Sequence, residues 1–217
     1  MGGAADITDA ALLAVVDDCC AWPMALRAER LATLLASDAA MTLGDRDRAL
    51  WSWKRRRFGA RALAVFDCSA CGATISFAVP AGFEVPEAVA AQAVVHVGPQ
   101  EWVLRLPTMQ DVRDGFAMAA LCAGAPWEDV GFRTLAAAAL DAADPGMDVV
   151  FDVSCADCGQ ANARAFDVPA FVWADVVART DALMADVAVL GRAFGWTEPQ
   201  TLALPAQRRA RYVEMVT

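Results

Sequence analysis

The fold is decided by two short stretches of sequence, CSACG at residues 68–72 and CADCG at residues 155–159. In each stretch two residues separate a pair of cysteines, and a glycine follows the second cysteine. This spacing lets both sulfurs of a pair face one ion, and the glycine permits the tight turn around it. Two such turns facing each other would complete a tetrahedral shell of thiolates. The sequence therefore predicts one structural zinc ion, bound by Cys68, Cys71, Cys155 and Cys158.

The separation between the two pairs sets the architecture of this zinc site. Cys68 and Cys155 lie 87 positions apart, whereas the pairs of a compact zinc ribbon are separated by about 15–20 residues. The ribbon is therefore expected to be split, with a lobe inserted between its halves. Because the ion would tie together segments that are distant in sequence, we expect metal binding to decide whether the chain folds.

Strand-like segments flank both cysteine pairs and repeat each other. An apolar segment with alternating character enters each pair, at 64–67 and 149–153, and another leaves each pair, at 74–79 and 163–169. Alternation of this kind is typical of strands. Each pair therefore predicts a hairpin with the cysteines at its tip.

The inserted lobe combines strands and helices. Residues 93–97 and 102–106 predict two strands that are separated by a Gly-Pro turn. Helices are expected to follow at about 108–122 and 127–143, and the sequence Asp-Pro-Gly at 144–146 marks a break.

The N-terminal region predicts helices. A Thr-Asp pair at residues 8–9 can cap a first helix, which should stop near Pro23. A later helix should begin near Thr42 and end at Gly59, after the basic run at 54–57. We expect those cations to face the negative end of the helix dipole and not a nucleic acid.

The C-terminal region predicts the longest helix of the chain, which should end at Gly195. Thr197 and Gln200 have the spacing of a capping box for a short helix. A last helix is expected from about Pro205 to Met215.

The predicted fold class is α+β, mainly α-helical, with a split four-cysteine zinc ribbon in two hairpins. Five regions are expected along the chain: N-terminal helices (1–60), the first ribbon half (61–80), an inserted strand and helix lobe (81–147), the second ribbon half (148–169) and C-terminal helices (170–217).

Composition and charge exclude several function classes. The 217 residues carry a formal net charge of −9, whereas binding to nucleic acid needs a basic surface. The only lysine, Lys54, does not belong to a phosphate-binding Gly-Lys loop. No uncharged apolar stretch approaches the roughly 20 residues that cross a bilayer, and the start lacks the pattern of a secretory signal. We therefore expect a cytoplasmic protein without a nucleic-acid or membrane partner.

The residues argue against an enzyme. Four cysteines would close the zinc shell and leave no position for a catalytic water. The only histidine, His96, lies in an apolar run and is expected to be an ordinary strand residue, with no nucleophile elbow to accompany it. No small-molecule substrate is expected.

Two further groups of residues are expected to be structural or solvated. Free cysteine behaves as a small apolar residue, so core packing is expected for three others: Cys19, Cys20 and Cys122. A set of acidic side chains lacks the pattern of a calcium loop and is expected to be solvated: Asp141, Asp144, Asp148 and Asp152.

A series of short motifs along the chain resembles a known family. The motifs are GDRDR at 44–48, FG at 58–59, RLPT at 105–108, FVWAD at 171–175, FGWTE at 194–198 and LPAQRRARY at 204–212, together with the cysteine pairs. They are similar to those of the T-even phage baseplate hub assembly chaperone family, whose members occur in contractile phages and related contractile injection systems.

The resemblance implies a non-enzymatic assembly factor or small structural subunit at the baseplate hub of a contractile tail. Its partners would be other baseplate or tail proteins, met in the bacterial cytoplasm or in the particle. The C-terminal segment contains Trp196, Tyr212 and several arginines, which are residue types enriched at binding hot spots. Simple packing of Trp196 on the helix end is the alternative for this segment.

Two other functions stay open at this point. Paired cysteines also occur in zinc ribbons that bind nucleic acid, although the acidic charge counts against that class. A thiol–disulfide enzyme would use each Cys-x-x-Cys as a redox dithiol without zinc.

Overall fold

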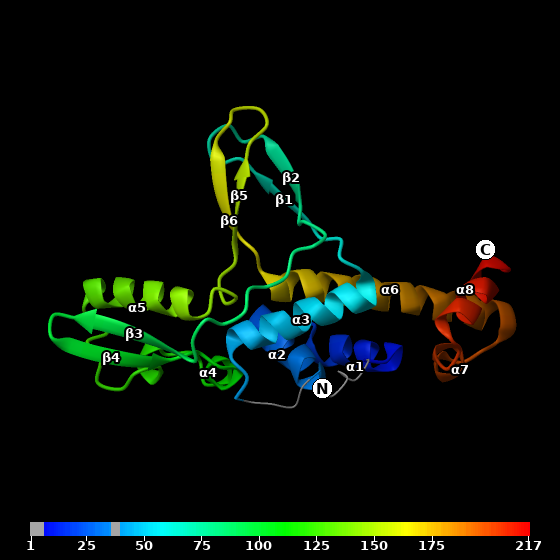
Figure 1. Cartoon of the computed structure of the whole chain (residues 1–217). Coiled ribbons are helices and arrows are strands. Elements are labelled where there is room, and N and C mark those ends of the chain that lie inside the picture. Colours follow the sequence, from blue (N-terminus) through cyan, green and yellow to red (C-terminus); the bar gives the residue numbers. More distant parts are fainter. Residues whose placement is uncertain (1–6, 36–39) are drawn as a thin grey trace.

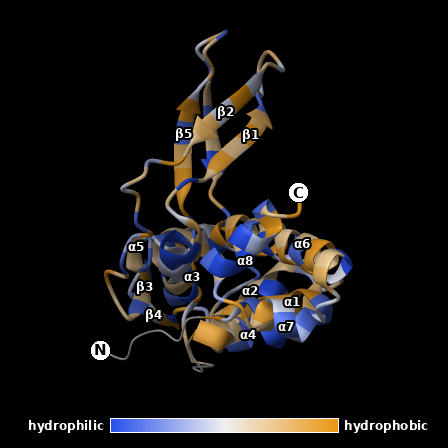
Figure 2. Cartoon of the chain, turned by 90° about the vertical axis from the view of Figure 1, so that its right-hand side faces the viewer, coloured by the Kyte–Doolittle hydropathy of each residue, from blue (hydrophilic) through white to orange (hydrophobic). Residues whose placement is uncertain are grey.

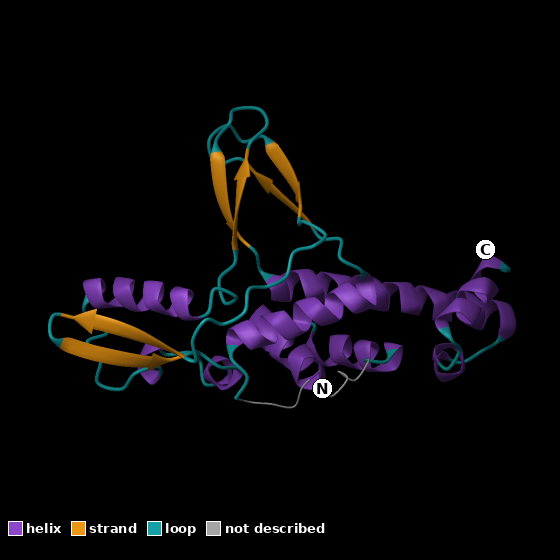
Figure 3. Ribbon diagram, viewed as in Figure 1, coloured by secondary structure: helices purple, strands orange, loops and turns teal. Residues whose placement is uncertain are grey.

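The computed structural model describes residues 7–35 and 40–217, which are arranged around one long helix (Figure 1). A body of helices lies along that helix, two hairpins project from the body, and a lobe of strands and a helix lies beside one end (Figure 3). The mixed α+β class expected from the sequence is confirmed. No helix in these residues is both long and apolar enough to cross a membrane.

The body is built on the long helix α6 (Val168–Phe194). It packs against α1 (Asp9–Cys19), α2 (Met24–Leu35) and α3 (Leu43–Phe58). All four helices contribute apolar side chains to one core, because each buries one side against the others. Fully buried members of this core include Leu12, Leu31, Leu50, Trp51, Val172 and Val176.

The helix limits follow signals in the sequence. The Thr8 and Thr42 side chains accept hydrogen bonds from backbone N–H groups in the first turns of α1 and α3, which satisfies donors that the helix leaves unpaired. Helices α3 and α6 end at Gly59 and Gly195, where φ is +89° and +70°. Glycine adopts these angles without steric cost, and the predicted ends are confirmed.

The basic run at 54–57 makes internal contacts. Lys54 is only 1% exposed, and its ammonium group donates to the carbonyls of Gly59 at 3.0 Å and Arg61 at 2.6 Å. Arg57 binds a carboxylate on α1. The last turn of α3 contains Arg55, Arg56 and Arg57, as the prediction that cations lie at the end of this helix requires.

The cysteine pairs lie at the tips of two antiparallel hairpins. The first hairpin is formed by β1 (Leu63–Asp67) and β2 (Thr74–Ala78), the second by β5 (Val150–Ser154) and β6 (Ala161–Ala165). The same order of buried and exposed positions occurs in β1 and β5, and again in β2 and β6. The two hairpins therefore repeat each other in structure as well as in sequence.

Aromatic rings connect both hairpins to the helical body at the hairpin ends that lie away from the cysteines. Phe77 of the first hairpin and Phe151 of the second have ring centroids 5.2 Å apart. Phe166, which lies just before α6, is edge-on to Trp51 of α3 at 5.2 Å. Phe83 contacts Trp51, Phe151 and Phe166. These contacts anchor the hairpins at the end opposite the cysteines.

The lobe has a core of its own. Strands β3 (Gln92–Val97) and β4 (Gln100–Arg105) form an antiparallel pair, and α5 (Val130–Ala143) packs against one face. Leu104 and Phe132 are buried in this core. The two predicted strands and the second predicted helix are confirmed.

The helix predicted at 108–122 is wrong in extent. The chain forms only α4 (Met109–Arg113) and the short 3-10 helix η1 (Met118–Ala120) there. Helix α4 stops because Gly115 and Phe116 have positive φ angles of +84° and +34°, which a right-handed helix excludes. The loss of helix at these two residues separates α4 from η1.

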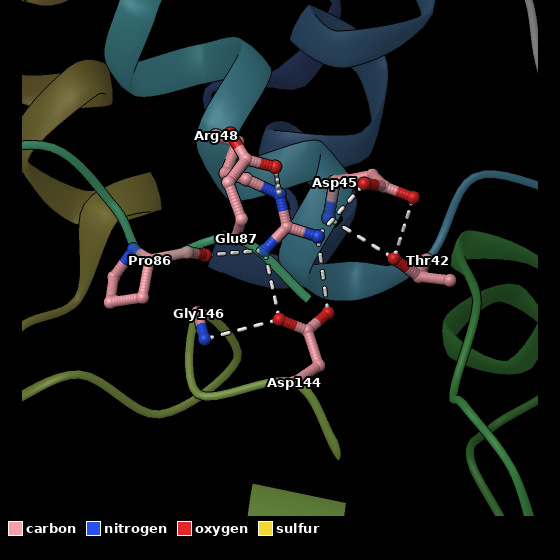
Figure 4. A network of polar contacts seen from close by, with 7 residues as sticks. All are labelled: Thr42, Asp45, Arg48, Pro86, Glu87, Asp144 and Gly146. Atoms are coloured by element: carbon pink, nitrogen blue, oxygen red, sulfur yellow. Dashed lines mark hydrogen bonds and ion pairs between the residues drawn. The ribbon is translucent and has the colours of Figure 1, made fainter. Parts of the chain in front are cut away.

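A buried ion pair joins the lobe to the body (Figure 4). Asp144, which the sequence analysis places in solvent, is 0% exposed, so that prediction is wrong for this residue. Its carboxylate accepts two hydrogen bonds from Arg48 of α3, at 2.8 and 3.2 Å. Arg48 also donates to the Pro86 carbonyl at 2.6 Å and to Asp45 at 2.8 Å. Although burial opposes its charge, the bonds to Asp144 and Asp45 raise the pKa of Arg48.

The packing around this ion pair predicts a strong effect of Gly44→Ala. A methyl group at residue 44 would lie 2.0 Å from a carboxylate oxygen of Asp144, so the ion pair must move. We expect a loss of about 1–3 kcal/mol in the free energy of unfolding, measured by urea denaturation. Gly82→Ala is the control, since a methyl group there meets nothing within 4 Å. Equal stability of the two variants would contradict the prediction.

The short C-terminal helices fold back on the end of α6. Helix α7 (Glu198–Leu202) begins with the capping box predicted for Thr197 and Gln200. Helix α8 (Ala206–Glu214) follows and contacts α6. Figure 2 looks onto this end of the molecule.

Candidate metal centre

The hairpin tips bring the four predicted cysteines together. Their sulfur atoms all lie within 4.8 Å of one another. The sulfurs of Cys68 and Cys158 are 3.7 Å apart, and those of Cys71 and Cys155 are 3.8 Å apart. In a tetrahedral site with zinc–sulfur distances near 2.3 Å, sulfurs are separated by about 3.8 Å. The four side chains therefore have an arrangement that can hold a metal ion.

The two loops that carry these sulfurs have the same backbone structure. In the first, the Cys68 N–H donates to the Ala73 carbonyl at 2.8 Å, and the Gly72 N–H donates to the Cys68 carbonyl at 3.0 Å. The second loop repeats both bonds at 2.8 and 2.9 Å, from Cys155 and Gly159. Both glycines have a positive φ, +73° and +76°, a conformation that disfavours any side chain. The Cys-x-x-Cys-Gly pattern thus has a direct structural cause.

Without a metal, the thiols of Cys68 and Cys158 differ in acidity. Backbone N–H groups of Cys71 and Ala70 stabilise the Cys68 thiolate and lower its pKa to about 6. The Gln160 N–H favours the Cys158 thiolate, but the neighbouring cysteine sulfurs outweigh it and raise the pKa of Cys158 to about 12. A bound cation would favour the ionised form of all four cysteines, because metal ligands bind as thiolates.

Asn162 of β6 is a supporting residue that the sequence analysis missed. It is 4% exposed, and its amide oxygen accepts hydrogen bonds from the backbone and the hydroxyl of Ser69, both at 3.0 Å. Its amide nitrogen donates to the Gln160 carbonyl at 2.9 Å and lies 3.8 Å from the Cys68 sulfur. One side chain therefore connects both cysteine loops.

Arg164, two residues along the same strand, also crosses between the hairpins. Its guanidinium lies 4.4 Å from the ring centre of Phe66 and donates to the Asp67 carbonyl at 2.9 Å. At the positions that correspond in the first hairpin, the chain has Ile75 and Phe77. The second hairpin therefore has polar residues at two inward positions where the first hairpin has apolar ones. This difference between the repeats is the sequence signal that could have identified Asn162 and Arg164.

The contacts of Asn162 predict a weaker metal site when they are lost. We expect Asn162→Ala to reduce zinc affinity about 10-fold to 100-fold, the usual effect of removing a group that orients metal ligands. Competition with a chromophoric chelator measures this affinity. Gln160→Ala is the matched control, because that side chain is exposed and bonds only to the next residue. An unchanged affinity in Asn162→Ala would show that the loops hold their positions without it.

The other candidate residues lie elsewhere. His96 is an exposed residue of β3, 4.0 Å from Glu101. Cys19 is buried and Cys122 is half-buried, as expected, but Cys20 is exposed, so the prediction of core packing is wrong for it. It directly follows α1, where the chain turns toward α2. Over residues 7–35 and 40–217, no second group of His, Cys, Asp or Glu side chains has the geometry to hold a metal.

Comparisons of the chain with known protein families, with curated proteins and with solved structures give no match.

Proposed function

We propose that the protein is a non-enzymatic assembly factor or small structural subunit of the baseplate hub of a contractile tail, stabilised by one structural zinc ion in a split zinc ribbon. The observation that carries the structural role is the cluster of four cysteine sulfurs. Four protein ligands fill a tetrahedral shell, so no position remains for water or substrate. A site of this kind holds two segments together and does not perform chemistry.

Zinc is proposed as the ion because it favours tetrahedral thiolate sites and has no redox chemistry of its own. Iron also binds four thiolates. Elemental analysis of the purified protein tests the choice, with one zinc per chain as the expected result. Stoichiometric iron, with the visible absorption of an iron–thiolate centre, would replace zinc in this proposal. A protein with no metal and two reactive dithiols would overturn it in favour of a redox function.

The baseplate function rests on the sequence resemblance, and the structure gives its motifs physical roles. Arg48 of the GDRDR motif forms the buried pair with Asp144. Arg105 of the RLPT motif binds Asp111 through two hydrogen bonds, at 2.7 and 2.5 Å. These residues hold the lobe and its neighbouring segments in place, which is a reason for their spacing that does not depend on catalysis.

A nucleic-acid-binding ribbon is less well supported. Such a protein needs exposed cations near its hairpins, but the second hairpin exposes Asp152 and Asp157. Its Arg164 stacks on Phe66. In the basic run on α3, Lys54 and Arg57 are also occupied by internal contacts.

Gene deletion in the cell that produces the contractile particle tests the proposed function. We expect sheath and tube proteins to be made but not assembled into contractile tails, as seen by electron microscopy of sedimented particles. The gene restored in trans should recover assembly. Normal numbers of contractile tails in the deletion strain would overturn the proposal.

A further inference from the structure

Helix α8 has an unusual division between its buried and exposed sides. Arg209 is only 2% exposed, and its guanidinium donates to Asp9 at 2.7 Å and Asp186 at 3.0 Å. Residues that lie away from it on the helix, Arg208 and Arg211, are exposed. Met215, one turn beyond Arg211, is 74% exposed. The helix therefore buries a charge and presents an apolar side chain to solvent.

Three aromatic rings form a platform beside α8. Phe194 and Trp196 are stacked with ring centroids 4.8 Å apart, and Tyr212 of α8 meets Trp196 edge-on at 5.0 Å. Phe194 is 43% exposed. The left-handed turn at Gly195 and the capping box of α7 fix this arrangement. Trp196 thus packs on the end of α6, while Phe194 and Tyr212 keep part of their surface accessible.

The arginines around this platform lack internal partners. Within the described residues, the side chains of Arg192, Arg208 and Arg211 make no hydrogen bond or ion pair. The exposed charged side chains of residues 190–217 are three arginines and two glutamates, a formal charge of +1, on a chain whose net charge is −9. The three arginines therefore form a locally basic surface on an acidic molecule. Exposed cations without partners are available to carboxylates of another protein.

We propose that this α8 surface binds an acidic segment of a partner protein that also carries an apolar side chain. The α8 surface is defined by Arg192, Phe194, Arg208, Arg211, Tyr212 and Met215. Arginine pairs with carboxylates in two parallel hydrogen bonds, and aromatic and arginine side chains are the usual anchors of interfaces. Complementary charge fixes the partner class and speeds the encounter. The inference deepens the proposed function, since it names the surface through which an assembly factor would bind.

Two other occupants fit the surface less well. A nucleic acid would satisfy the arginines but leave Met215 in water, and its many phosphates would meet the acidic body. A second copy would place its acidic body against this surface and create a head-to-tail contact that does not close on itself. Both are outcomes of the test.

The test uses fluorescence anisotropy of a labelled peptide in which glutamates flank leucines. Two further probes are the same peptide with glutamine in place of glutamate and an oligothymidine strand of equal charge. We expect the acidic peptide to bind most tightly, with binding weakened by salt. Arg208→Glu/Arg211→Glu should weaken it about tenfold or more, equivalent to about 1.4 kcal/mol. Arg56→Glu/Arg61→Glu, exposed arginines elsewhere, should change it little.

Several results would overturn this inference. They are equal binding of the acidic and glutamine peptides, equal weakening by the two double variants, tighter binding of oligothymidine, and self-association in sedimentation that Arg208→Glu/Arg211→Glu abolishes. Circular dichroism shows whether each variant is folded. The gene-deletion experiment is independent of these probes, so failure of the α8 surface and failure of the baseplate proposal are distinguishable.

Discussion

Replacement of Cys155 by serine should abolish tight zinc binding and separate the two hairpins, while the helical body stays folded. Cys155 is buried at the hairpin tips, where, among the residues that the structure describes, Cys68 and Ile75 are the other buried apolar members of the cluster. The small apolar cluster at the tips and the contacts of Asn162 and Arg164 do not offset the loss of a structural zinc, whose binding is worth on the order of 10 kcal/mol. The body has a separate core of apolar residues from four helices, so we expect it to survive.

Hydrogen exchange followed by mass spectrometry measures which segments lose their structure when the metal is lost. Backbone amides at 63–78 and 150–165 should lose protection in Cys155→Ser and in wild-type protein treated with a strong chelator. Amides of α3 and α6 should keep theirs. Cys20→Ser is the control, since Cys20 is exposed and outside the cluster. Unfolding of the whole chain would mean that the metal decides whether the chain folds, as the sequence analysis expects, and unchanged hairpins would contradict a structural ion.

Local signals allowed the hairpins and the cysteine cluster to be predicted from sequence. The spacing of two cysteines and a glycine dictates a turn within five residues, and its repetition indicates that the pairs meet. The helix caps at Thr8 and Thr42 are equally local. In each case the residues that decide the structure are close together in the chain.

Long-range polar contacts escaped prediction because nothing local specifies them. Arg48 and Asp144 are 96 positions apart, and the sequence around Asp144 also suits a solvated turn. The helix predicted at 108–122 failed for a different, local reason. Apolar residues continue through that segment, but Gly115 and Phe116 have positive φ angles, so the chain leaves the helical conformation after α4.

A second large effect is expected from Asp9→Asn, which removes a charge at the meeting point of four helices. Asp9 accepts hydrogen bonds from Arg57 at 2.5 Å, Arg179 at 2.6 Å and Arg209 at 2.7 Å. These arginines come from α3, α6 and α8. An asparagine keeps the shape but leaves three cations without their shared anion. We expect a loss of about 3 kcal/mol in the free energy of unfolding, a large part of the 5–15 kcal/mol typical of a domain.

The pH dependence distinguishes lost charge from lost packing at Asp9. Burial alone would raise the pKa of Asp9, but hydrogen bonds from Arg179 and Arg209 and the charge of Arg57 lower it. Since the folded pKa lies below the unfolded value near 4, the ionised carboxylate stabilises the fold above that pH. Its contribution is lost as pH falls through the folded pKa.

The stability difference between wild type and Asp9→Asn, measured by urea denaturation, should therefore shrink below about pH 4. Asp17→Asn, at an exposed position on the same helix, should match the wild type throughout. If the difference in the free energy of unfolding between wild type and Asp9→Asn stays constant in acid, the charge of Asp9 is not its cause. The effect would then be assigned to packing.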